Sequence, residues 1–173
     1  LLDDVRLAEP VIRDADILGI DMKCLSWESI ADPLNGNPNG FDSRSICAIS
    51  RYAGISDRLS FLGLYELIST PMMSKLLAQM IWYFIEGVQY RYDEYPVNIN
   101  EGFLKYTVAL SNQNLVFFRS QTSDRWWMEI TNDSHLDNKS KTTTLLACTR
   151  EDYEHAKSDI IPERWYNAIK RMH

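Results

Sequence analysis

The chain has 173 residues, of which 45% are hydrophobic, and a formal net charge of -6. This length is sufficient for one sizeable hydrophobic core. An acidic chain without a long run of basic residues argues against a nucleic-acid-binding or anionic-membrane-binding surface, so we expect small molecules or other protein chains as partners. The 3 cysteines are widely spaced and form no Cys-x-x-Cys pair, which indicates neither a disulfide framework nor a thiolate zinc site and favours a reducing, cytoplasmic setting.

The first residues show no sign of a secretory signal, because a basic start followed by an apolar stretch is missing. The longest apolar run, residues 80 to 85, is too short to cross a bilayer. We therefore predict no membrane association.

The first 96 residues predict an α/β arrangement. A short helix over residues 3 to 15 leads into an apolar strand at 17 to 21, and a second strand is expected at 58 to 65. The helix between the strands begins at the N-cap Asp42, and Gly54 is predicted to end it in a left-handed conformation. A strand, helix and strand of this length form a right-handed parallel unit, which places Asp21 and Glu66 at the same edge of the sheet. A further helix over residues 74 to 92 is apolar around most of its circumference and must be packed on several sides.

After Pro96 the hydrophobic pattern changes to a period of two, which indicates an antiparallel extension over residues 97 to 173. Thr149 opens a short helix with a capping box, and Pro162 is expected at the first position of a last helix. The strands are predicted at residues 103 to 110, 115 to 120, 125 to 131 and 142 to 148, and the first two form a hairpin with a loop at 111 to 114.

Several longer strings carry a specific resemblance. They are Asp-Met-Lys at 21 to 23, Asn-Pro-Asn-Gly-Phe at 37 to 41, Arg-Tyr-Ala-Gly-Ile-Ser-Asp at 51 to 57, Gly-Leu-Tyr-Glu at 63 to 66, Ala-Gln-Met-Ile-Trp-Tyr-Phe-Ile at 78 to 85, Ser-Asp-Arg-Trp-Trp-Met-Glu at 123 to 129 and Glu-Arg-Trp-Tyr at 163 to 166. Over nearly the whole chain, these strings resemble the C-terminal half of the ureohydrolase (arginase/agmatinase/formimidoylglutamase) family, nearest its bacterial formimidoylglutamase-like branch.

The resemblance implies the C-terminal part of an arginase-like parallel three-layer α/β/α fold in residues 1 to 96, followed by an antiparallel β and short-helix extension. It also implies a manganese-dependent hydrolase of linear amidines or guanidines that forms a homo-oligomer when full length. The family's first metal ligands, an Asp-x-His-x-Asp segment and a separate histidine, lie upstream of the matched region. We therefore interpret the chain as a fragment and expect it to be poorly soluble or to self-associate alone.

The resemblance also assigns site residues. In the family's Asp-x-Asp-x-x-Asp motif, Asp21 matches the first metal ligand, but Lys23 and Ser26 stand at the other two acidic positions. Three interpretations of this departure remain: a single metal, a lysine that swings out to solvent, or an ammonium that replaces a metal charge. Glu66 matches the glutamate that holds the substrate's guanidinium or amidinium, and Asn39 and Gly40 match a loop near the substrate.

Two functions follow from this assignment. The first is an amidine hydrolase with formimidoylglutamate as the first-choice substrate and arginine or agmatine behind it. The second is a catalytically silent family member that serves as a ligand-binding or assembly module. The Asp21 and Lys23 pair favours the second function and Glu66 favours the first.

The remaining candidates have simpler interpretations. His135, His155 and His173 have no ligand spacing and are predicted to be surface residues. Arg125 and Arg164, each within an acid-Arg-Trp-aromatic string, are expected to stack on rings and to pair with nearby acids, with guanidinium or anion binding as the alternative.

Overall fold

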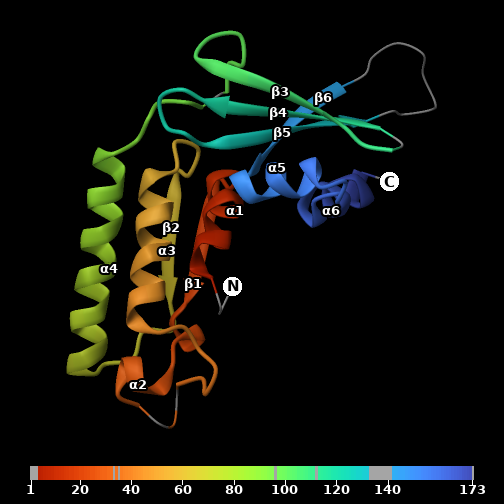
Figure 1. Ribbon diagram of the computed structural model, residues 1–173. Helices are drawn as coiled ribbons and strands as arrows, with labels where there is room; N and C mark the ends of the chain where they lie inside the picture. The colour runs from red at the N-terminus through yellow and green to blue at the C-terminus, as the bar shows by residue number, and fades with distance from the viewer. Residues whose placement is uncertain are drawn as a thin grey trace. The chain divides into compact units, whose positions relative to one another are not determined.

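The computed structural model describes residues 4–32, 34, 36–95, 97–111, 113–132 and 142–172. The protein is mixed α/β, with a two-stranded parallel sheet and a four-stranded antiparallel sheet (Figure 1). It divides into two compact units, which we call unit 1 (Leu1–Pro96) and unit 2 (Val97–His173). The division falls where the hydrophobic period of the sequence changes. In the described part of the chain, no helix is long and apolar enough to cross a membrane.

Unit 1 is built on the parallel pair β1 and β2. Its elements are η1 (Val5–Ala8), α1 (Glu9–Arg13), β1 (Ile17–Asp21), η2 (Met22–Cys24), α2 (Trp27–Ile30), α3 (Ser43–Ile55), β2 (Phe61–Tyr65) and α4 (Pro71–Gln89). The two strands run parallel, with Ile17 opposite Phe61 and Asp21 opposite Tyr65. The predicted parallel strand, helix and strand unit is thus confirmed.

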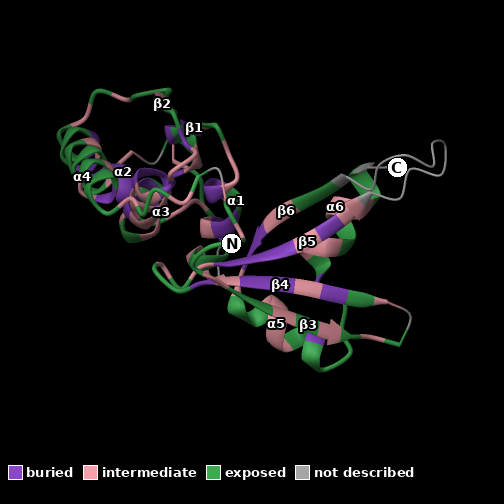
Figure 2. Ribbon diagram, turned by 90° about the horizontal axis from the view of Figure 1, so that it is seen from above, coloured by how far each residue is buried: buried purple, intermediate pink, exposed green. Residues whose placement is uncertain are grey.

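The two faces of this sheet differ in burial. Ile20 is buried in the core of unit 1, and Leu18, Leu62 and Leu64 pack against that core. On the opposite face, Ile17 is 66% exposed and Phe61 is 52% exposed. The first and last residues of both strands are exposed, whereas β4 of unit 2 is drawn mostly in the colours of buried and intermediate residues (Figure 2). Unit 1 therefore covers one face of its parallel sheet and leaves the other open.

Helix α3 begins as predicted but ends differently. The Asp42 side chain caps it, with its Oδ1 accepting the backbone N–H of Ser45. The prediction that Gly54 ends the helix in a left-handed conformation is wrong, because α3 continues to Ile55 and Ser56 follows in an extended conformation. A Cβ atom at Gly54 would lie 2.2 Å from the carbonyl oxygen of Phe84. The glycine is needed because α3 and α4 pack backbone to backbone at this point.

Helix α4 starts at Pro71 and ends at Gln89, a few residues earlier at both ends than predicted. Met73, Leu76 and Met80 are buried against the core of unit 1. Packing on several sides was expected, but the other side of the helix is exposed. Its exposed apolar residues are Met72, Ile81, Trp82, Tyr83, Ile85 and Val88.

Unit 2 is an antiparallel meander with two helices. Its strands, paired in chain order, are β3 (Phe103–Ala109), β4 (Asn114–Ser120), β5 (Trp126–Asn132) and β6 (Thr142–Cys148), followed by α5 (Arg150–Lys157) and α6 (Glu163–Met172). Leu115, Phe117, Trp126 and Met128 form its core, with Tyr153 and Trp165 packed against it. The predicted hairpin, the two further strands and their antiparallel character are confirmed.

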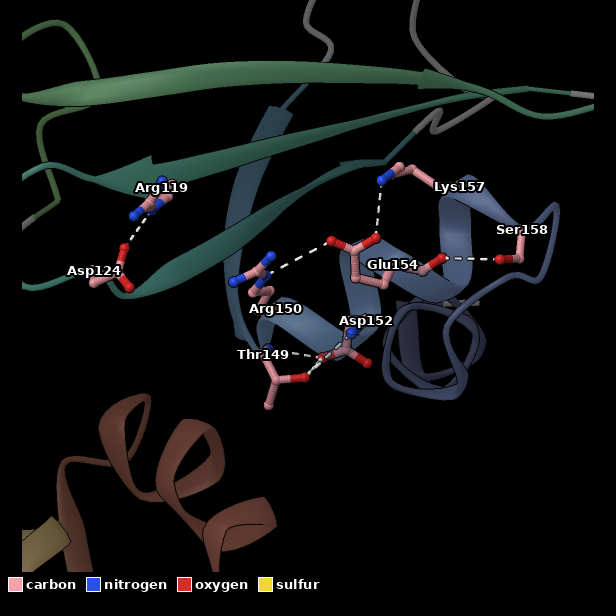
Figure 3. Close-up of polar contacts among 8 residues, drawn as sticks. All are labelled: Arg119, Asp124, Thr149, Arg150, Asp152, Glu154, Lys157 and Ser158. Atoms are coloured by element: carbon pink, nitrogen blue, oxygen red, sulfur yellow. Dashed lines mark hydrogen bonds and ion pairs between the residues drawn. The ribbon is translucent and has the colours of Figure 1, made fainter.

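The start of α5 carries the predicted capping box. The Thr149 side chain accepts the backbone N–H of Asp152, and the Asp152 carboxylate accepts the backbone N–H of Thr149 at 2.8 Å (Figure 3). The next helix departs slightly from the prediction. Pro162 stands directly before α6, and its carbonyl oxygen accepts the N–H of Tyr166 at 3.1 Å.

Candidate functional site

The candidate site lies at the carboxyl ends of β1 and β2. Asp21 is the last residue of β1 and lies opposite Tyr65, the last residue of β2, so Glu66 leaves the sheet at the same edge (Figure 1). Open α/β sheets place ligands outside the carboxyl ends of their strands. The predicted juxtaposition of Asp21 and Glu66 follows directly from this register.

Lys23 and Glu66 form an ion pair at this edge. The Lys23 Nζ atom lies 2.9 Å from Glu66 Oε2, with the two side chains 54% and 56% exposed. The hydrogen bond to Glu66 raises the pKa of Lys23, and the charges of Glu66 and Asp21 act in the same direction. The Lys23 ammonium therefore keeps its charge at neutral pH, and the ion pair is lost as the pH rises through this elevated pKa. The structure thus shows the Lys23 ammonium paired with Glu66, while about half of the lysine side chain remains exposed to solvent.

Glu66 has an unusual backbone conformation. Its φ of 56° lies in the left-handed region, where a residue with a Cβ atom is disfavoured by about 1–2 kcal/mol. Such strain is typical of positions held by their surroundings, and it concentrates at functional sites. The residue in this left-handed conformation, directly after β2, is thus the one whose side chain pairs with Lys23.

Asp21 and Ser26 both have local structural roles. The Asp21 Oδ1 atom accepts the backbone N–H of Lys23 at 2.9 Å and so caps the short helix η2. Ser26 caps α2, and its hydroxyl also lies 2.7 Å from that of Ser29. Helix capping thus accounts for a serine at position 26.

Cys24 lies beside this edge and is half buried. Burial raises the pKa of its thiol, and the negative charge of Asp21 raises it further. The thiol is therefore protonated at neutral pH, which makes it a poor nucleophile.

The loop with Asn39 and Gly40 is tied to the segment that follows Lys23. The Phe41 N–H donates to the Cys24 carbonyl oxygen at 2.8 Å, and the Asn37 N–H donates to that of Leu25 at 2.9 Å. A Cβ atom at Gly40 would lie 2.3 Å from the carbonyl carbon of Leu25, so only glycine permits this approach. Asn39 is exposed, and its backbone N–H donates to the Asn37 side chain in a turn. The structure brings this loop to residues 24–26, and among the described residues no hydrogen bond or ion pair joins Asn39 or Gly40 to Glu66.

The described residues do not by themselves make a manganese site. Among them, no group of three or more His, Cys, Asp or Glu side chains is arranged to hold a metal ion. Glu66 is paired with Lys23, and the ammonium of Lys23 also lies near enough to Asp21 to feel its charge, which disfavours a cation beside Asp21. His155 is exposed on α5 in unit 2, and His135 and His173 lie outside the described residues.

In the second arginine string of unit 2, Arg164 forms an ion pair. Arg164 Nε lies 3.8 Å from Asp152 Oδ2, and the Arg164 side chain is 21% exposed. This supports a structural role for Arg164. Arg119 pairs with Asp124, the residue directly before Arg125 (Figure 3).

Comparison of the chain with family models, with curated proteins and with solved structures found no match. The resemblance to ureohydrolases therefore rests on the sequence strings alone, and the site must be judged by its geometry.

Proposed function

We propose that this chain is part of a hydrolase of linear amidines or guanidines of the ureohydrolase type. Formimidoylglutamate is the first-choice substrate, and arginine and agmatine follow. One observation carries the proposal: Glu66, at the carboxyl edge of a parallel sheet, already holds a cation, the Lys23 ammonium at 2.9 Å. The family is proposed from the resemblance of the sequence strings, and the parallel pairing of β1 with β2 is compatible with the parallel sheet of that family.

In this proposal the substrate competes with Lys23 for Glu66. An amidinium or guanidinium is planar and presents paired N–H donors, so it can form two parallel hydrogen bonds with a carboxylate, whereas an ammonium acts as a point charge. Because both side chains are about half exposed, the Lys23 contact is weak enough to be displaced. Lys23 would hold the carboxylate in place until the substrate arrives.

The arginase-like three-layer fold is part of the same proposal. Both strands of the two-stranded sheet have an unpaired edge among the described residues, and one face of the sheet is open. Parallel sheets are normally covered on both faces. Manganese is proposed with Asp21 as one ligand and with the other ligands contributed from outside the described residues.

A catalytically silent, ligand-binding member of the family is the second candidate. It is favoured by the replacement of two acids by Lys23 and Ser26, since each has a role that metal binding does not need. In that case Glu66 would bind the amidine without turnover.

Hydrolysis of formimidoylglutamate, arginine and agmatine by the full-length protein tests the proposal. Glu66→Gln should lower kcat/KM about tenfold to a hundredfold through loss of a charge-assisted hydrogen bond. Glu28→Gln, which removes an exposed carboxylate of α2, serves as the control and should leave kcat/KM unchanged. Unchanged activity in Glu66→Gln would remove Glu66 from the site, and an inactive parent protein would favour the silent member.

Metal analysis tests the manganese part separately. If Lys23 excludes one ion, the full-length protein with excess manganese should hold at most about one ion per subunit, and Lys23→Asp should raise this number. Two tightly bound ions in the unsubstituted protein would contradict this part of the proposal.

A further inference from the structure

A groove between α3 and α4 of unit 1 lies apart from the strand ends and shares no residue with the candidate site. Its volume is about 470 Å³, within the range of roughly 300–1,000 Å³ of small-molecule pockets. The lining residues that matter to the argument are Arg44, Cys47, Arg51, Tyr52, Gln79 and Tyr83.

The lining is rich in hydrogen-bond donors, and none of the described residues that line the groove is a carboxylate. Arg44 and Arg51 are seven residues apart on α3, which places both on one side of the helix about 10.5 Å apart along its axis. The hydroxyls of Ser43, Tyr52 and Tyr83 and the amide of Gln79 add neutral donors. A ligand with many acceptor oxygens fits this set.

The two guanidinium groups are incompletely paired. Arg44 makes no ion pair with a carboxylate among the described residues. The Nε atom of Arg51 is buried and has no hydrogen-bond acceptor, although Glu86 Oε2 lies 3.4 Å away as an ion pair. The Arg51 guanidinium carbon lies 5.8 Å from the centre of the Tyr90 ring, which restrains the group at the groove. The Arg51 side chain as a whole is 43% exposed, so part of it remains accessible to an anion that enters the groove.

We propose that this groove binds a small organic phosphate. A phosphate group has three terminal oxygens and two negative charges to share between Arg44 and Arg51, and it would compete with Glu86 for Arg51. The volume exceeds that of inorganic phosphate, so the organic part would lie against Tyr52, Tyr83 and the small residues Cys47 and Ala48. The inference does not depend on the proposed function, because it uses other residues.

Isothermal titration of the full-length protein with adenosine monophosphate, adenosine and benzoate tests the proposal. Adenosine monophosphate should bind, and adenosine should bind at least about tenfold more weakly, because it lacks the charge-assisted hydrogen bonds. Equal affinity for the two, tighter binding of benzoate, or no binding of adenosine monophosphate at about 10 mM would overturn the proposal.

Substitutions locate the binding. Arg51→Gln and Arg44→Gln should each weaken binding of adenosine monophosphate about tenfold or more. Lys75→Gln removes the same charge from an exposed position of α4 outside the lining and should change affinity less than about twofold. Arg44 is exposed, so its variant keeps the test decisive if Arg51→Gln fails to fold. An equal loss in Lys75→Gln would show a nonspecific charge effect and overturn the assignment.

Discussion

Unit 1 and unit 2 differ in how completely their own helices and strands bury the apolar residues of their sheets. In unit 2 the antiparallel meander and its own helices enclose an aromatic cluster, in which the Tyr153 ring lies 4.9 Å from Trp126 and 5.3 Å from Tyr106. In unit 1 the parallel pair β1 and β2 leaves Ile17 and Phe61 exposed, and α4 leaves its outer apolar side exposed. Antiparallel sheets tolerate one covered face, whereas parallel sheets normally need both. Unit 1 therefore exposes apolar surface on its sheet and on α4, which unit 2 does not do on its aromatic cluster.

The largest difference in the free energy of unfolding is expected between two substitutions of strand phenylalanines, one in each unit. Phe117 on β4 is fully buried at 0% exposure, so Phe117→Ala should destabilise unit 2 by about 3–5 kcal/mol. Phe61→Ala on the open face of β2 should cost less than about 1 kcal/mol. Denaturant unfolding followed by hydrogen exchange in each unit measures both values. Equal losses would show that the face of β2 is covered.

The exposed side of α4 should drive self-association. Trp82 is 69% exposed on α4, and burying an aromatic side chain at an interface contributes about 1.5–3 kcal/mol. Trp82→Gln should therefore weaken self-association of the chain about tenfold to a hundredfold, as measured by sedimentation velocity. Tyr166→Gln, at a 59% exposed aromatic of α6 in unit 2, should change it little. A monodisperse, monomeric parent chain would contradict the expectation that the chain self-associates through this surface.

The crossing of α3 and α4 should tolerate no added methyl group. A Cβ atom at Gly87 would lie 2.6 Å from the Arg51 carbonyl oxygen, so Gly87→Ala should destabilise unit 1 by about 1–3 kcal/mol. At Gly19 the nearest atom belongs to the exposed Tyr65 ring, 3.3 Å away, which can move. Gly19→Ala should change stability by less than about 1 kcal/mol, and a larger loss would indicate a covered face.

The smallest effect concerns the thiol of Cys24. Because the negative charge of Asp21 contributes to its raised pKa, Asp21→Asn should lower that pKa and speed alkylation at pH 8 by about twofold to threefold. The rate of Cys47, whose pKa is raised by burial alone, is the internal control and should not change. No change at Cys24 would place Asp21 too far from the thiol to act on it.

Hydrophobic periodicity predicted the order of the elements because each strand and helix buries a regular set of positions. Element boundaries that are set by tertiary contacts were harder to predict from the sequence. The role of Gly54 depends on Phe84, thirty residues later, and no local pattern distinguishes a glycine at a helix crossing from one at a helix end.

The candidate site was predictable in part for the same reason. The parallel register brings Asp21 and Glu66 to one edge, which follows from topology alone. The Lys23 contact with Glu66 depends on side-chain reach and on the left-handed backbone of Glu66, neither of which the sequence displays. The groove could not be predicted from the sequence. Arg44 and Arg51 stand two helical turns apart on α3, but Gln79 and Tyr83 of α4 complete the lining, and the packing of α4 on α3 is a tertiary contact.

Competition between Lys23 and a planar cation for Glu66 is the central claim, and a double-mutant cycle tests it most directly. Agmatine affinity of the full-length protein is measured by isothermal titration for the parent, Lys23→Met, Glu66→Gln and the double variant. The account predicts that Lys23→Met tightens binding severalfold, up to about tenfold, and that this gain disappears in the Glu66→Gln background. Weaker binding in Lys23→Met, or the same gain with and without Glu66, would contradict it.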